Sequence, residues 1–177
     1  HLNQQRLYNV QHLLVNKKLI AGAMLNERIL LAIETKRALL IDIENNAIIA
    51  EYQCDEECKQ ALEIDEGTFF LITSRGNIVF KASVEAHPPC LQEITVAQNL
   101  KRVFETRAQA TRSLTKVAGN LQAITGKSSL VLVKDRYRGT ILKKIIPPMS
   151  SGHPISLAFY KGFLYIVYSS VHVVRLF

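Results

Sequence analysis

The segment ILLAIETKRALLIDI, residues 29–43, decides the fold, because an apolar run, a short polar turn and a second apolar run follow one another in it. Similar phrases recur about every 45 residues, and their cores are residues 68–82, 121–134 and 163–176. A pair of short apolar runs around a polar turn is typical of two antiparallel strands. The recurrence therefore predicts an all-β chain that is built from about four repeats of one antiparallel unit.

Turn residues divide each repeat into strands. The first repeat predicts strands at residues 19–24, 29–35, 38–43 and 48–53. The last repeat, residues 154–177, offers only three. Four short strands in every 40 to 50 residues are typical of a β-propeller blade. We therefore expect residues 1–177 to form a single, partial β-propeller domain, with four-stranded antiparallel blades at about 19–53, 60–96, 113–146 and 154–177.

Apolar patterning indicates how the blades pack. In residues 29–33, 69–72 and 163–168 the second strand of a repeat is continuously apolar. A strand that is buried on both faces has this pattern, whereas a half-exposed strand alternates. Residues 97–112 break the pattern, since their apolar residues recur at three- and four-residue spacing without Pro or Gly. This spacing predicts a short helix inserted between the second and third repeats.

The last repeat carries a resemblance to a known family. Its strands at 154–159, 163–168 and 171–176 resemble those of WD-repeat β-propellers, and the similarity of spacing extends over about nine tenths of the chain. The chain has no Trp, so the Trp-Asp pair of that family is missing, and no Gly-His pair opens a repeat. The resemblance implies a divergent propeller that serves as a non-catalytic platform for protein interactions, by analogy of fold.

Four blades of this type are not expected to close a ring by themselves. Open sheet faces need cover, so we expect further sequence, self-association or a partner chain that donates blades to complete the ring. Residues 6–15 contain Leu7, Val10, Leu13 and Leu14. This spacing fits a strand of the closing blade as well as a helix packed on the ring.

Positive charge is concentrated in one part of the sequence. Net charge is −4 over residues 1–100, +9 over 101–145 and +2 over 146–177. A one-sided basic surface is typical of proteins that contact phosphate backbones. The alternatives are a solvated face and a dock for an acidic protein segment. The candidate binding residues are Lys101, Arg102, Arg107, Arg112, Lys134, Arg136, Tyr137, Arg138, Lys143 and Lys144.

Two motifs that suggest catalysis do not hold. Gly126-Lys127-Ser128 resembles the end of a phosphate-binding loop, but Leu121 stands where its first Gly is needed and a strand follows instead of a helix. His153 lies near Ser150 and Ser151, but no orienting carboxylate is close in sequence. We therefore expect no enzyme, no cofactor and no small-molecule substrate.

Cysteine and histidine side chains between residues 54 and 90 have the chemistry of zinc ligands, but the propeller fold keeps them apart. Cys54, Cys58, His87 and Cys90 offer four soft ligands. In a propeller, however, the loop that links two blades and the loop between the third and fourth strands of a blade leave at opposite ends. We expect no metal site from these residues.

Cysteine usage and hydropathy indicate the compartment. Three Cys are too few for a disulfide scaffold and favour a reducing environment, and no apolar run reaches the ~20 residues of a membrane span. We expect an intracellular, non-enzymatic scaffold, a propeller subunit of a larger multiprotein assembly that binds other protein subunits. The alternative is a ribonucleoprotein or chromatin component that binds RNA or DNA through residues 101–144. Nuclear localisation is favoured over cytoplasmic.

Overall fold

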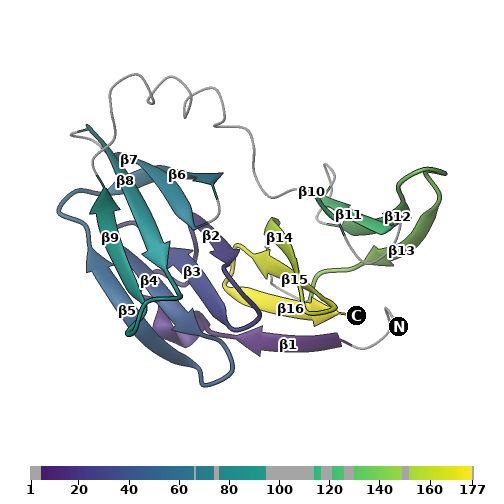
Figure 1. The fold of residues 1–177 in the computed structure, drawn as a ribbon, viewed down its shortest axis with the longest axis horizontal. Helices are drawn as coiled ribbons and strands as arrows, with labels where there is room; N and C mark the ends of the chain where they lie inside the picture. The colour runs from purple at the N-terminus through teal and green to yellow at the C-terminus, as the bar shows by residue number, and fades with distance from the viewer. Residues whose placement is uncertain are drawn as a thin grey trace.

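The structure, a computed structural model, describes residues 5–65, 67–73, 76–94, 114–116, 121–125, 130–148 and 152–176. Within these residues, sixteen strands form four antiparallel four-stranded sheets (Figure 1). This confirms the predicted all-β array of about four blades. The helix predicted at 97–112 lies outside the described residues. The described part of the chain has no helix of the length and apolarity that a membrane crossing requires.

Three sheets follow the sequence without interruption. Sheet 1 consists of β2 (Ala21–Met24), β3 (Ile29–Ile33), β4 (Arg37–Asp42) and β5 (Ala47–Gln53). Sheet 2 consists of β6 (Cys58–Asp65), β7 (Thr68–Thr73), β8 (Gly76–Ser83) and β9 (Cys90–Ile94). Sheet 3 consists of β10 (Leu114–Lys116), β11 (Leu121–Thr125), β12 (Val131–Asp135) and β13 (Ile141–Ile145). Each strand pairs with the next along the chain, as short turns between antiparallel strands require.

Sheet 4 is completed from the other end of the chain. Its own repeat supplies β14 (Pro154–Tyr160), β15 (Phe163–Tyr168) and β16 (His172–Leu176). The fourth strand is β1 (Gln5–Asn9), which pairs antiparallel with β16 so that Gln5 lies opposite Leu176 and Asn9 opposite His172. A single 3-10 turn, η1 (Gln11–Leu13), follows β1. The N-terminal stretch is thus a strand of the last blade and not a helix on the ring.

The sheets pack face to face in the order 2–1–4–3. Strands β4 and β5 contact β9, β2 contacts β14 and β15, and β14 contacts β10 and β11. Sheets 2 and 3 lie at opposite ends of a curved row (Figure 1). The two sheets that follow each other in the middle of the sequence are therefore the ones farthest apart.

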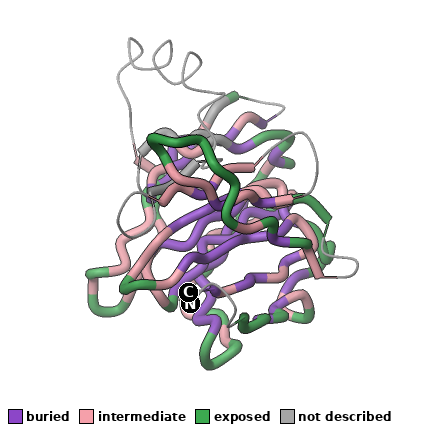
Figure 2. The backbone as a smooth tube through the Cα atoms, turned by 90° about the vertical axis from the view of Figure 1, so that its right-hand side faces the viewer, coloured by how far each residue is buried: buried purple, intermediate pink, exposed green. Residues whose placement is uncertain are grey.

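Three apolar clusters fill the spaces between neighbouring sheets. All five residues of β3 are buried. Leu30 and Ala32 belong to the cluster against sheet 4, whereas Ile29, Leu31 and Ile33 belong to the cluster against sheet 2. Buried backbone accordingly runs through the middle of the molecule, with the exposed segments at its margins (Figure 2). The continuous apolar run of the sequence is explained by sheets on both sides of β3.

Candidate interaction site

Sheet 3 has one covered face and one open face. In β12, Val131 and Val133 are fully buried in the cluster shared with sheet 4, whereas Leu132 between them is half-buried. Strand pairing places Ile124 and Lys144 beside Leu132, on the side away from sheet 4. We call this side the sheet 3 open face and define it by Gln122, Ile124, Leu132, Lys134, Ile141 and Lys144.

Sheet 2 has a corresponding open face at the other end of the row. Phe69, Leu71 and Phe80 pack in the cluster shared with sheet 1. The residues that alternate with them lie on the far side, where half-buried Ile72 accompanies exposed Lys81. The sheet 2 open face is defined by Ile72, Lys81, Gln92 and Ile94, which surround Val79, a residue on the same side that is 7% exposed. Within the described residues, no further sheet packs on either open face.

The turn between β12 and β13 contains three of the predicted binding residues: Arg136, Tyr137 and Arg138. The Oδ1 atom of Asp135 accepts hydrogen bonds from the backbone N–H groups of Tyr137 and Arg138, both at 2.9 Å. Gly139 has φ +70° and donates its N–H to the Asp135 carbonyl at 3.0 Å. Asp commonly caps a turn in this way, and Gly adopts the positive φ without strain. Arg136, Tyr137 and Arg138 are therefore held outward at the tip.

Side chains at this tip are exposed to solvent. Tyr137 is 73% exposed, and the Arg136 guanidinium lies 5.5 Å from the centre of its ring, within the range of a cation–π contact. In the described part of the chain, no carboxylate pairs with the following basic residues of sheet 3: Lys134, Arg136, Arg138 and Lys144. The tip thus carries cations together with one aromatic ring.

The predicted site residues are only partly gathered. Lys134, Arg136, Tyr137 and Arg138 follow one another along β12 and its turn. Lys143 and Lys144 lie on β13 but on alternate faces, because Lys143 pairs with Val133 and Lys144 with Leu132. Four others lie outside the described residues: Lys101, Arg102, Arg107 and Arg112.

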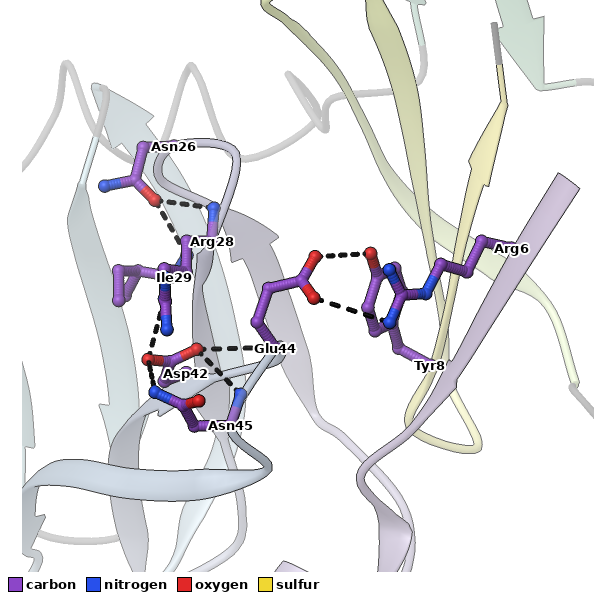
Figure 3. Close-up of polar contacts among 8 residues, drawn as sticks. All are labelled: Arg6, Tyr8, Asn26, Arg28, Ile29, Asp42, Glu44 and Asn45. Atoms are coloured by element: carbon purple, nitrogen blue, oxygen red, sulfur yellow. Dashed lines mark hydrogen bonds and ion pairs between the residues drawn. The ribbon is translucent and has the colours of Figure 1, made fainter. Parts of the chain in front are cut away.

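A polar network between sheets 1 and 4 was not foreseen from the sequence. Glu44, in the turn between β4 and β5, accepts a 2.6 Å hydrogen bond from the Tyr8 hydroxyl of β1 (Figure 3). Its carboxylate also lies 3.5 Å from Arg6 and 3.7 Å from Arg175. Burial and the bond to Glu44 together raise the pKa of Tyr8 to about 12. We call this group the Glu44 network; it ties the closing strand to sheet 1.

Asp42 organises the same turn. Its carboxylate accepts a 2.8 Å hydrogen bond from Arg28 and is contacted by the N–H groups of Glu44 and Asn45 (Figure 3). Burial acts to raise the pKa of Asp42, but these hydrogen bonds outweigh it and the net pKa is lowered. The carboxylate is thus held ionised, and it fixes the turn that presents Glu44.

A pocket of about 530 Å³ lies beside this network, between sheets 1 and 4. The charged groups that line it are already engaged: Lys161 contacts Glu27 at 2.6 Å, and Arg175 lies near Glu44 and 4.4 Å from the centre of the Phe163 ring. The two ion pairs, Lys161 with Glu27 and Arg175 with Glu44, join segments more than 130 residues apart, so short-range sequence patterns contain no signal for them. Their arrangement holds the sheets together.

Among the described residues, the candidate metal ligands do not form a cluster. No three His, Cys, Asp or Glu side chains gather as metal ligands within the described residues. Cys54 and Cys58 are buried in the cluster between sheets 1 and 2, and burial raises the pKa of both thiols, that of Cys58 to about 11. Residues 126–128 and 150–151 lie outside the described residues, and His153 is exposed.

Comparison with known proteins gives matches of structure only. No family model and no curated protein matches the sequence. Solved structures that resemble it include BamB from Moraxella catarrhalis (15% identity, TM-score 0.30, 85% of this chain) and the β-propeller domain of Cps50 (Swd1) from Myceliophteria thermophila (12%, 0.31, 85%). A third is the WD40 β-propeller domain of Doa1 (11%, 0.33, 90%).

The chain spans 41% of the BamB chain, 49% of the Swd1 chain and 50% of the Doa1 chain. The Swd1 and Doa1 structures are both described as β-propeller domains, and that of Doa1 as a WD40 propeller. The fold itself follows from four meandering four-stranded sheets packed in a row, the last of them closed by the N-terminal strand. In its fold, the chain is a partial β-propeller.

Proposed function

We propose that the chain is a non-enzymatic scaffold, a subunit of a larger intracellular multiprotein assembly whose protein partners bind at the two open faces. The observation that carries this proposal is the difference between the sheets. Sheets 1 and 4 are covered on both faces, whereas the part of the chain that the structure describes covers sheets 2 and 3 on one face only.

The open faces have a composition suited to a partner sheet. Ile124, Leu132 and Ile72 are half-buried apolar side chains on central strands. Face-to-face packing of another sheet would remove them from water, and each fully buried Leu or Ile contributes about 1.5–3 kcal/mol. Lys134, Lys144 and Lys81 surround them with charge that keeps the faces hydrated until a partner arrives.

The test is affinity purification of the tagged chain from cells that express it, followed by nuclease treatment and mass spectrometry. We expect stoichiometric protein partners that survive nuclease. Leu132→Glu or Ile72→Glu should release them, because each places a charge in the contact. Ile48→Glu is the matched control, since Ile48 is 37% exposed on the outer strand of sheet 1. Equal partner recovery from all three variants, or no partner at all, would refute the proposal.

A second candidate function is RNA or DNA binding through residues 101–144, as in a ribonucleoprotein or chromatin component. It is supported by the exposed turn in which Arg136, Tyr137 and Arg138 stand together. Arginine contacts phosphates and an exposed ring stacks on bases, so this combination suits a single strand. Nuclear localisation belongs to this candidate.

Fluorescence anisotropy with a labelled single-stranded RNA tests the second candidate across a salt series. Reversing the charge of Arg136, Arg138 and Lys144 should flatten the slope of log affinity against log salt by about 2, because each phosphate contact on a single strand contributes about 0.7. Reversal of exposed Lys17 and Lys18, outside the basic region, is the control. A wild-type chain that binds with no salt dependence would contradict this candidate.

A further inference from the structure

We infer that a second copy of this chain completes the propeller, with the sheet 2 open face of each copy packed on the sheet 3 open face of the other. This inference rests on the proposed function, because it names the partner of the same two faces. The product is a two-fold symmetric ring to which each copy contributes its four sheets.

The position of the gap points to a separate molecule. Because β1 pairs with β16, both ends of the described chain lie in sheet 4. Sheet 4 is bonded to sheet 1, where the Tyr160 hydroxyl donates to the Met24 carbonyl at 2.9 Å and the Tyr165 hydroxyl to the Glu27 carbonyl at 3.0 Å. The seam between the chain ends is therefore already closed, and the open side of the row lies between sheets 2 and 3.

Linker lengths agree with a gap in the middle of the chain. Neighbouring sheets are joined by short links, residues 54–57 between β5 and β6 and residues 146–153 between β13 and β14. Residues 95–113 separate β9 from β10. A chain of that length can reach about 65 Å, at 3.3–3.6 Å per residue. Sheets 2 and 3 of one copy can thus stay connected while another molecule stands between them.

A second copy is the occupant that satisfies every open face at once. Each copy has one sheet 2 open face and one sheet 3 open face. A two-fold axis forms the same contact twice and leaves neither copy with an uncovered end, as closed symmetry requires. The resulting ring of about eight sheets is within the range of known propellers. Along the ring, a sheet 3 then follows a sheet 2, which is also their order in the sequence.

Charge selects contact between unlike ends. The segment that contains sheet 2, residues 58–94, has a net charge of −2, whereas residues 114–146, which contain sheet 3, have +6. Packing sheet 3 of one copy on sheet 3 of the other would bring two strongly basic units together. At the faces themselves, two sheet 3 open faces would bring Lys134 and Lys144 of both copies together, whereas the sheet 2 open face presents only Lys81 to them. Contact between unlike ends therefore has less like-charge repulsion, and the segments around it have net charges of opposite sign, so it is favoured.

Light scattering on the purified chain gives the first measurement. The chain has a mass of 19.9 kDa, so we expect a species of twice that mass. Leu132→Glu and Ile72→Glu should each weaken self-association by roughly tenfold or more, because the introduced charge would be buried in the contact. Ile48→Glu should leave the mass unchanged. A wild-type chain that stays single at all working concentrations overturns the inference.

Mixing the two variants tests the arrangement of the copies. In a pair made of one Leu132→Glu chain and one Ile72→Glu chain, both changes fall in the same contact and the other contact is intact. The mixture should therefore recover a species of double mass that contains one chain of each kind, read with two different tags. If the mixture stays single, or if either variant alone still pairs fully, the unlike-end arrangement is wrong. Thermal melting checks folding, and Ile124→Glu with Ile94→Glu is a second pair if the first does not fold.

Failure of this inference and failure of the proposed function give different results. A chain that stays single by mass but captures a different protein, which Leu132→Glu releases, overturns the second-copy inference and leaves the scaffold proposal standing. A chain that stays single and captures nothing refutes both.

Discussion

Sheets 1 and 3 contain the same four-stranded meander but differ in how many of their faces are covered. All five residues of β3 in sheet 1 are buried, whereas the residues of β12 in sheet 3 alternate between fully and partly buried at Val131, Leu132 and Val133. Both strands occupy inner positions of their sheets. The difference therefore comes from the neighbouring sheets: a strand becomes continuously apolar when sheets lie on both sides of it.

Removal of β1, the strand that completes sheet 4, should lower the free energy of unfolding more than any other change in this comparison of sheets. Deletion of residues 1–10 takes away Tyr8 and Val10, which are 6% and 1% exposed. At about 1.5–3 kcal/mol for each large buried side chain, the free energy of unfolding should fall by about 3–6 kcal/mol in urea titrations followed by circular dichroism. Deletion of residues 1–4 alone, which leaves β1 in place, is the control. Equal stability of the two truncated chains would mean that β1 does not hold sheet 4.

Core truncation compares the two kinds of sheet directly. Leu39→Ala, in sheet 1, should cost about 3 kcal/mol, because the side chain is fully buried and leaves a cavity. Leu132→Ala, in sheet 3, should cost about 1 kcal/mol at dilutions where chains are single, since half-buried Leu132 has less to lose. Both values come from urea unfolding. If Leu132→Ala costs as much as Leu39→Ala under these conditions, the sheet 3 open face is covered within one chain.

The Glu44 network can be weakened by removing one hydroxyl. Tyr8→Phe deletes the donor of the 2.6 Å bond and leaves the Glu44 carboxylate partly unsatisfied. A hydrogen bond to a charged group contributes about 1.5–3 kcal/mol, and partial exposure of Glu44 places the expected loss near the lower limit. Tyr137→Phe removes the hydroxyl of an exposed ring in sheet 3 and should change the thermal midpoint very little. Similar losses for both variants would argue against a special role for the network.

The smallest expected effect on stability is that of the Asp42 charge, and it can be followed by acid titration. Because the folded-state pKa of Asp42 is lowered below its ordinary 3.8, its ionised form stabilises the fold above that pH, and the contribution is lost as pH falls through the folded-state value. Asp42→Asn should therefore be about 1 kcal/mol less stable than the parent near neutral pH. The gap should narrow as the solution becomes more acidic than the ordinary pKa.

Exposed Asp55, replaced by Asn, is the control for this titration. A gap between Asp42→Asn and the parent that stays constant down to the acid transition would show that the charge of Asp42 does not stabilise the turn.

The sequence predicted the strands of sheet 1 well because their signal is local. The apolar run at residues 29–33 and the turn at Glu44-Asn45-Asn46 lie within one repeat. The role of β1 could not be decided, since Leu7 and Val10 fit a strand or a helix and its partner β16 lies at the other end of the chain. Pairing over that distance is set by tertiary packing, which short-range periodicity does not record.

The candidate site, too, could be predicted only where its signal is local in the sequence. The cluster of positive charge identified Arg136, Tyr137 and Arg138, and the turn that exposes them depends on neighbouring Asp135 and Gly139. The open faces were expected only as a general need for ring completion. Which strands carry them became clear from the packing order, because Leu132 and Ile72 look like ordinary core residues in the sequence.

Pairing of β1 with β16 also sets the timing of folding during synthesis. During synthesis β1 is made first, and the strand that it needs is translated about 170 residues later, since Gln5 lies opposite Leu176. Until then, β1 is an unpaired strand on a growing chain, and such edges are prone to pair with the wrong partner. Contacts between distant residues also slow folding. Sheets 1 and 2 can form as they emerge, whereas sheet 4 must wait for β16.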